Sequence, residues 1–187
     1  MSKNNLKHTH PISFRKFDIE KDASVLLEWV NNPHAKYWGM LEANLNDLVA
    51  TYTQLLSVPN YQIYIGEINQ ESTFLMESYD PKTDFIAKHY DVLEGDCGMH
   101  VLIKPPQEQI TGFTWHIFSN IINFLFLNKK CKRIVVEPDV NNKKIHRLNK
   151  RAGFKYDKQV VLPEKIAFLA FCTLESYEQQ CAKLIEI

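Results

Sequence analysis

The chain has 187 residues, of which 45% are hydrophobic and 24% charged, and its 22 basic and 22 acidic residues give no formal net charge. These proportions are typical of one soluble globular domain and exclude a disordered tail, a fibre and a disulfide-stapled miniprotein. Zero net charge disfavours sequence-independent nucleic-acid binding. No apolar run is long enough to cross a membrane and no signal peptide is visible, so we expect a cytoplasmic protein without a membrane partner.

We expect a flexible leader over residues 1–11 and a single domain over residues 12–187. Four cysteines carry no C-x-x-C pair, and in a cytosolic chain they are expected to be buried, reduced thiols rather than a disulfide framework. They are Cys97, Cys131, Cys172 and Cys181. The seven histidines also lack metal spacing, so we expect no metal site.

The first half of the chain predicts a strand, two helices and a hairpin. Residues 12–17 alternate apolar and polar side chains, the pattern of a strand. Residues 18–22 are polar and are expected to precede the first helix. Helical spacing of apolar residues follows over 23–30 and 44–56, and the first helix ends before Pro33 because a residue preceding proline avoids helical geometry. The expected hairpin strands are 61–68 and 72–79, followed by a loop over 80–84.

The second half predicts alternating strands and helices, with helical spacing most evident in the first helix. The expected strands are 98–104, 133–137, 154–162 and 166–174, the expected helices are 112–128 and 141–152, and residues 175–187 are helix-like. The resulting order βααβββαβαββ is that of an α/β domain with one mixed, mostly antiparallel sheet of about six or seven strands flanked by helices.

The junction between the strand ending at Lys104 and the helix beginning at Gly112 is a candidate anion site, because the first backbone N–H groups of a helix lack partners within it. The sequence of this loop resembles the Q/R-x-x-G-x-G/A motif of the GCN5-related N-acetyltransferases (GNAT). In that family the loop holds the pyrophosphate of coenzyme A. The resemblance implies an acyl-CoA co-substrate bound by Gln109, Ile110, Thr111, Gly112, Phe113 and Thr114.

Two further stretches resemble a narrower branch of this family, which acylates hydroxylated amines in hydroxamate siderophore assembly, as in the aerobactin and mycobactin pathways. They are residues 95–103, G-D-C-G-M-H-V-L-I, and residues 135–142, V-V-E-P-D-V-N-N. The branch implies His100 and Asp139 as the catalytic pair, with Asn141 and Asn142 beside coenzyme A. Two departures are Cys97 in place of the usual arginine and a phosphate loop without its basic residue.

The residues make chemical sense for acyl transfer from a thioester. A histidine titrating near neutrality is the usual proton acceptor, and a nearby aspartate can orient it or the amine. A hydroxylamine is less basic than an alkylamine and demands less of that base. A backbone N–H of the central strand, at Leu102 or Ile103, is expected to hold the oxyanion. We expect direct transfer without an acyl-enzyme.

The acceptor pocket is predicted on the same resemblances. Trp38 lies in a tryptophan-rich stretch like that beside the acceptor pocket of the siderophore branch. Glu77 and Tyr79 belong to an E-S-Y strand like that of the aminoglycoside 6′-N-acetyltransferases. Asp96 is one of several acidic residues that could hold a cationic substrate, the others being Asp80, Asp84, Asp91 and Glu94.

The sequence therefore predicts an acyl-CoA-dependent N-acyltransferase that acylates N6-hydroxylysine or an N-hydroxydiamine, in the service of iron acquisition. Two alternatives stay open: an aminoglycoside 6′-N-acetyltransferase, and a non-catalytic acyl-CoA-binding module. The acyl donor (acetyl, succinyl or longer) and the choice between monomer and homodimer are also open.

Overall fold

The computed structural model describes residues 11–105 and 110–185. Within these ranges one seven-stranded sheet runs in the order β1-β2-β3-β4-β5-β7-β6. The element order confirms the predicted βααβββαβαββ, with one more helix at the end. The strands are β1 (Ile12–Lys16), β2 (Gln62–Ile68), β3 (Glu71–Tyr79), β4 (Asp96–Ile103), β5 (Arg133–Val136), β6 (Lys155–Val161) and β7 (Ile166–Thr173).

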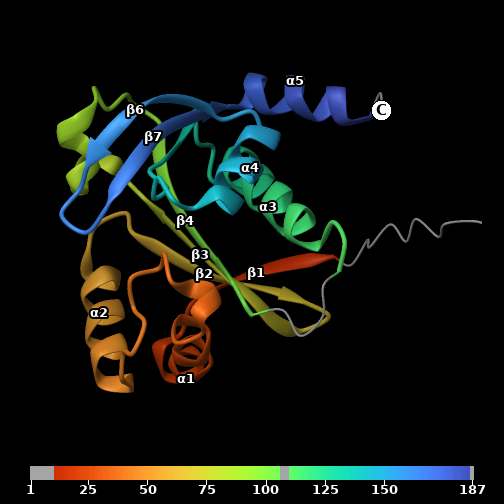
Figure 1. Cartoon of the computed structure of the whole chain (residues 1–187). Coiled ribbons are helices and arrows are strands. Elements are labelled where there is room, and N and C mark those ends of the chain that lie inside the picture. Colours follow the sequence, from red (N-terminus) through yellow and green to blue (C-terminus); the bar gives the residue numbers. More distant parts are fainter. Residues whose placement is uncertain (1–10, 106–109, 186–187) are drawn as a thin grey trace, which may run out of the picture.

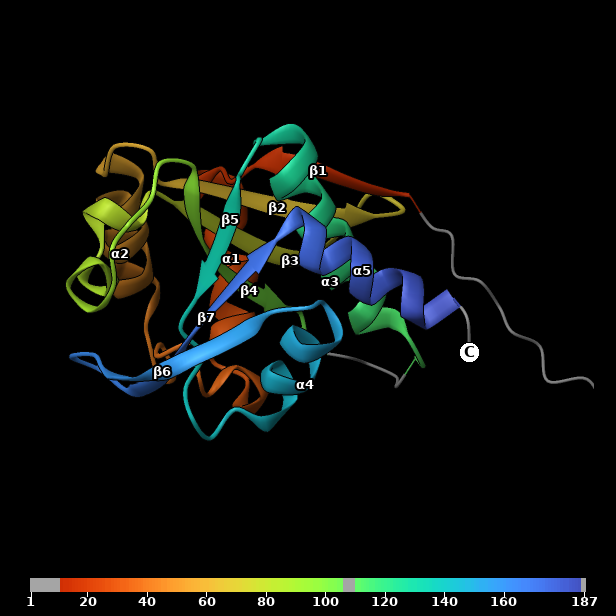
Figure 2. The ribbon, with the colours of Figure 1, turned by 90° about the horizontal axis from the view of Figure 1, so that it is seen from above.

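The helices cover both faces of the sheet. They are α1 (Ile19–Val30), α2 (Leu45–Ser57), α3 (Phe113–Asn123), α4 (Lys143–Arg151) and α5 (Leu174–Ile185). Figure 1 shows α1 and α2 on one side of the sheet and α3, α4 and α5 on the other. Seen from above, the β6–β7 hairpin forms the edge of the sheet away from β1 (Figure 2).

Two of the differences from the predicted helices have local reasons. The first helix begins at Ile19 rather than residue 23, because the side chain of Asp18 accepts the Glu20 N–H and caps the helix. The predicted helix over 112–128 is α3 followed by a π-helical turn, Phe124–Asn128. The predicted leader lies almost wholly outside the described residues.

Six strand pairings build the sheet, and five of them are antiparallel. The exception is β4–β5, which is parallel and pairs only Asp96–Gly98 with Arg133–Val135. Beyond Gly98, β4 continues to Ile103 without pairing to β5, while it stays paired with β3 on its other side. The sheet therefore separates between β4 and β5 in the middle of the molecule.

The two main cores lie on opposite faces of the sheet. On the α3 side, Met99 and Val101 pack with Phe118 and Ile121, and on the α1–α2 side Leu102 packs with Trp29 and its neighbours. Side chains alternate along β4, as a strand requires. His100 therefore points to the α1–α2 side, whereas its neighbours Met99 and Val101 point to the α3 side.

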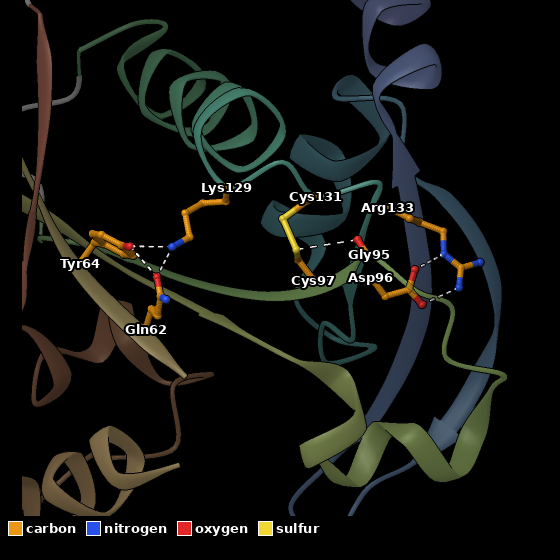
Figure 3. The surroundings of a disulfide bond; sticks show 8 residues. All are labelled: Gln62, Tyr64, Gly95, Asp96, Cys97, Lys129, Cys131 and Arg133. Atoms are coloured by element: carbon orange, nitrogen blue, oxygen red, sulfur yellow. Dashed lines mark hydrogen bonds and ion pairs between the residues drawn. A yellow bond between two sulfur atoms is a disulfide. The ribbon is translucent and has the colours of Figure 1, made fainter. Parts of the chain in front are cut away.

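The expectation that all four cysteines are reduced is wrong for two of them. Cys97 and Cys131 form a disulfide (Figure 3). Cys172 and Cys181 are free. The bond ties β4 to the segment that precedes β5, where Cys97 lies level with Ile134 in the parallel register. A sequence separation of 34 residues carries no pairing signal, because the two positions become neighbours only when the strands align.

Candidate active site

A cavity of about 530 Å³ lies where β4 and β5 separate. Its lining includes Trp38 and Tyr52 from the α1–α2 side, His100 from β4, and Phe118 and other residues from the α3 side. Residues from both faces of the sheet thus meet in one space. Two substrates entering from opposite faces would meet in the gap between the strands.

The imidazole of His100 lies between two carboxylates. Its Nδ1 is 2.9 Å from Oε2 of Glu77, and its Nε2 is 2.7 Å from Oε1 of Glu137. The side chain of His100 is 31% exposed, whereas both glutamate side chains are only 5% exposed. The ring thus has an open face, while its two partners are buried.

This arrangement makes His100 a cation. An ionised carboxylate only accepts hydrogen bonds, so two of them require an N–H on both ring nitrogens, and only the imidazolium has both. Burial disfavours the charge, but the charge of Glu137 and the hydrogen bonds to Glu137 and Glu77 outweigh burial and raise the pKa of His100 to about 10. At neutral pH the ring has no free lone pair with which to act as the predicted base.

Glu137 is held ionised by the same contacts. Burial would raise the pKa of its carboxyl group, but the charge and hydrogen bond of His100, with Lys165 in support, lower that pKa to about 2. The ammonium of Lys165 lies 3.5 Å from Oε1 of Glu137. Two carboxylates therefore face two cations, and the buried charges balance.

Glu137 lies within the E-P-D motif, but the sequence prediction assigned it no role. A glutamate at the end of a buried apolar strand run was the available signal, since such a charge is rarely buried without a partner. Lys165 and Tyr61 were also missed, and neither carries a recognisable pattern. Tyr61 donates to Oε2 of Glu77 at 2.6 Å, so this oxygen serves both the tyrosine and His100.

Aromatic rings enclose the imidazole. The Trp38 ring meets it edge-on at 6.3 Å between centroids, and the Tyr79 ring lies 5.0 Å away. The hydroxyl of Tyr79 donates to Glu137 at 3.3 Å. Gly98 makes this packing possible, because a Cβ there would lie 2.2 Å from the Tyr79 ring. Of the predicted acceptor-site residues, Trp38 and Glu77 line the cavity, and Tyr79 packs against its histidine.

Asp96, also predicted to bind the acceptor, lies elsewhere. Its carboxylate forms a two-pronged ion pair with Arg133, with contacts of 2.8 and 2.7 Å (Figure 3). It lines a separate cavity of about 280 Å³ beside the disulfide, together with Asp80 and Glu94. Of the acidic residues proposed to hold a cationic substrate, the main cavity contains only Asp84.

Asp139, the other predicted catalytic residue, lines the main cavity but makes no hydrogen bond or ion pair with His100. Its Oδ1 accepts the N–H of Asn141 at 2.7 Å, which shapes the turn into α4. Asn142 also lines the cavity and caps α4 by accepting the N–H of Ile145 at 3.3 Å. Asn141 lies outside the cavity lining, and its carbonyl accepts the hydroxyl of Tyr37.

The two predicted oxyanion donors, the N–H groups of Leu102 and Ile103, point in opposite directions from β4. The N–H of Lys104 donates to Thr73, and bonding alternates along an antiparallel ladder, so the N–H of Leu102 also points to β3. The N–H groups of Ile103 and Val101 then point toward the gap. The Ile103 carbonyl, which points the same way as its N–H, accepts a hydrogen bond from Nε2 of His34 at 3.2 Å. Of Val101 and Ile103, Val101 lines the cavity.

The predicted pyrophosphate loop is described in part. Gln109 lies outside the described residues. Gly112 has a φ of +83°, which favours glycine, and it begins α3 without a side-chain cap. Ile110 and Thr111 precede this turn, and Phe113 and Thr114 form the first turn of the helix. The N–H of Phe113 donates to the Ile110 carbonyl at 3.2 Å. The other N–H groups of this first turn suit an anion, as the family resemblance implies.

In the described ranges, no group of three His, Cys, Asp or Glu side chains has the geometry of a metal site, and no helix is both long and apolar enough to cross a bilayer.

Comparisons with known proteins match this geometry to a family. An acetyltransferase (GNAT) domain model matches residues 18–162. The chain is 25% identical to the N-hydroxyputrescine acetyltransferase of Acinetobacter baumannii, over 94% of this chain and 84% of that protein. It is 31% identical to the lysine N-acyltransferase MbtK of Mycobacterium tuberculosis, over 72% of this chain and 65% of that protein.

Solved structures share the fold. An uncharacterized protein from Bacillus halodurans superposes with a TM-score of 0.84 and 30% identity, covering 91% of this chain and 88% of its own. AAC(6′)-Ib in complex with paromomycin and acetyl-CoA gives a TM-score of 0.77 at 22% identity, covering 90% of this chain and 96% of its own, which is a likeness of fold. The chain therefore belongs to the GNAT acetyltransferases, and it is an acyltransferase enzyme.

Proposed function

We propose that this enzyme transfers an acyl group from an acyl-CoA thioester to the nitrogen of a hydroxylated amine, either an N-hydroxydiamine or N6-hydroxylysine. The product is a hydroxamate, a ligand for ferric iron. The name of the A. baumannii relative, an N-hydroxyputrescine acetyltransferase, supports this acceptor class. The proposal keeps the acyl donor open between acetyl and succinyl.

One observation carries the choice of acceptor: His100 is held as a cation by Glu77 and Glu137. An alkylamine is an ammonium ion at neutral pH and must lose a proton before it attacks. An imidazolium cannot remove that proton, and a carboxylate with a pKa of about 2 is a very weak base. A hydroxylamine is largely neutral at pH 7, so it attacks without prior deprotonation.

The reaction then needs three contributions from the chain. The acceptor nitrogen bonds to the thioester carbon, and the N–H of Val101 stabilises the oxyanion that forms, with the charge of His100 adding to it. The nitrogen, now positively charged and acidic, gives its proton to the carboxylate of Asp139. The C–S bond breaks, and the proton passes from Asp139 to the departing thiolate, which restores the site.

The test is coenzyme A thiol release from acetyl- and succinyl-CoA with matched acceptors. N6-hydroxylysine and N-hydroxydiaminobutane are compared with lysine, diaminobutane and kanamycin, using wild type and His100→Ala. Turnover confined to the hydroxylated amines, and strongly reduced in the variant, is expected. Equal turnover of the parent amines would contradict the proposal.

One observation favours the alternative of an aminoglycoside acetyltransferase. Three acidic residues line the main cavity and could face a polycation: Asp84, Asp139 and Glu164. Kanamycin turnover above that of the hydroxylated amines would establish this second function.

A further inference from the structure

Asn149 on α4 lines the main cavity, and its side chain contains a buried carbonyl oxygen without a hydrogen-bond donor among the described residues. The residue is only 1% exposed, yet it lines the same space as His100. In the part of the chain that the structure describes, its Oδ1 has no hydrogen-bond partner. A buried amide oxygen without a donor is costly, so a native site that retains one is expected to receive a donor from a ligand.

A chain of hydrogen bonds sets the orientation of this amide. The Val140 carbonyl lies 3.3 Å from Nε2 of His146 and must accept, so of the two neutral tautomers only the one with its proton on Nε2 fits. Nδ1 then accepts the hydroxyl proton of Tyr156 at 2.8 Å. The Tyr156 oxygen is left to accept Nδ2–H of Asn149 at 3.3 Å.

The opposite amide orientation breaks this chain. With Oδ1 toward Tyr156, the hydroxyl proton would go to Asn149, and Nδ1 of His146 would have to donate to the hydroxyl oxygen. Nε2 of the neutral ring would then face the Val140 carbonyl without a proton, an oxygen and a nitrogen that are both acceptors. Of the two neutral tautomers of His146, the one that the Val140 carbonyl selects therefore matches the observed amide, with Nδ2 donating to Tyr156 and Oδ1 unpaired.

The position of Asn149 indicates which substrate it meets. Ile145 and Ala152, one turn away on the same face of α4, pack in the core on the α3 side of the sheet. His100 and Trp38 lie on the other side, where the acceptor is proposed to bind. The start of α3, the predicted phosphate site, belongs to the same side as Asn149 (Figure 1). Asn149 therefore lies on the donor side of the gap.

We propose that Oδ1 of Asn149 accepts the amide N–H nearest the thioester in the acyl-CoA donor, and so positions the thioester beside the gap. This assignment rests on the acyl-CoA donor of the proposed function and is independent of the acceptor. The adjacent arm of coenzyme A carries amide N–H donors, which match an oxygen acceptor held rigidly in a largely apolar wall. Asn149 is thus a positioning residue.

The experiment measures binding by calorimetry with two ligands of the same shape. One is acetyl-CoA, and the other is its analogue in which that amide N–H is replaced by an ester oxygen. Wild type is expected to bind the analogue about three- to tenfold more weakly, the range for one hydrogen bond. Asn149→Ala is expected to bind acetyl-CoA more weakly by a similar factor and to lose the discrimination between the ligands.

Tyr156→Phe is the second variant, because it keeps Asn149 and removes only the hydroxyl that orients its amide. This variant is expected to discriminate less than wild type between acetyl-CoA and the ester analogue. Thermal unfolding checks that it retains the fold. Asn31→Ala, on the far side of the sheet at the end of α1, is the control and is expected to discriminate fully.

Equal binding of both ligands by wild type would overturn the assignment, and so would full discrimination in Asn149→Ala. An Asn149→Ala variant that binds acetyl-CoA normally but has a raised KM for the acceptor would place the residue on the acceptor side and also overturn it. If no hydroxylated amine is acylated but the ligands are discriminated as expected, the proposed acceptor fails while this inference holds.

Discussion

Glu77 and His100 face each other directly across the β3–β4 ladder, with Oε2 and Nδ1 2.9 Å apart. Register alone brings them together, because residues opposite in an antiparallel pair project their side chains on the same face. The second partner, Glu137, directly follows β5, the strand that pairs with β4 on its other side. The imidazole is therefore held between two glutamates, and we call this arrangement the Glu77–His100–Glu137 clamp.

The pH dependence of turnover follows from this clamp. With a hydroxylated amine, kcat/KM is expected to rise only as the acceptor loses its own proton and then to stay level up to about pH 9. The group that would otherwise limit the rate, His100, keeps its charge because its pKa is raised to about 10. Initial rates from pH 5 to 10 measure this. A rise that follows an enzyme group titrating near pH 6.5 in the free enzyme would instead identify a neutral-histidine base.

The same pair predicts how stability depends on pH. The folded-state pKa of His100 is raised, from an ordinary 6.5 to about 10, so its stabilisation is complete below pH 6.5 and is lost as pH rises toward 10. Glu137 acts in the opposite direction: its lowered pKa gives stability that is present above pH 4.5 and is lost as pH falls toward 2. The contribution of the pair is greatest between pH 4.5 and 6.5.

Urea unfolding of wild type and His100→Gln at pH 6, 8 and 9.5 tests this. The free energy of unfolding of wild type, relative to the variant, is expected to decrease with rising pH, by at most about 1.4 kcal/mol per pH unit for one proton. Titrating groups that do not interact with His100 cancel in the comparison. A difference that does not change with pH would show that His100 is neutral in the folded enzyme.

The disulfide predicts a dependence of stability on redox conditions. It closes a 34-residue separation between Cys97 and Cys131, and a bond over such a loop typically adds about 2–4 kcal/mol to the free energy of unfolding. Urea unfolding with and without a thiol reductant should show this loss in wild type and none in Cys97→Ser. Cys181→Ser, which removes a free cysteine, is the control and should respond as wild type does. Identical unfolding of wild type in both buffers would exclude the bond.

Much of the fold is readable from the sequence, because strand alternation and helical spacing report local burial, and these gave the element order correctly. Helix starts were less accurate, since the Asp18 cap acts through its side chain and not through apolar spacing. His100 and Asp139 were found through motif resemblance, and both line the cavity. Their catalytic roles stay predictions.

The interactions of these residues were not readable, because they depend on strand register. Glu137 became the partner of His100 only when β5 aligned with β4, and Asp96 found Arg133 in the same way. The disulfide and the unpaired oxygen of Asn149 have the same origin. Each of these features depends on contacts between residues that are distant in the sequence. Local sequence patterns do not encode such contacts.

Gly98 has no side chain, and the Tyr79 ring packs beside His100 in the space that a side chain would take. A Cβ at this position would lie 2.2 Å from the ring, a distance that requires the tyrosine to move. Because Tyr79 is 3% exposed and its neighbours are tightly packed, Gly98→Ala is expected to cost about 1–3 kcal/mol of unfolding free energy and to lower kcat by disturbing the clamp.

A double-mutant cycle separates this contact from a general loss of backbone freedom. Tyr79→Ala removes the ring that the new methyl group meets, so Gly98→Ala is expected to cost much less in the Tyr79→Ala background than in wild type. Chemical unfolding of the four proteins gives the coupling energy. An equal cost in both backgrounds would mean that the Gly98 requirement arises from the strand backbone rather than from the tyrosine that shields the Glu77–His100–Glu137 clamp.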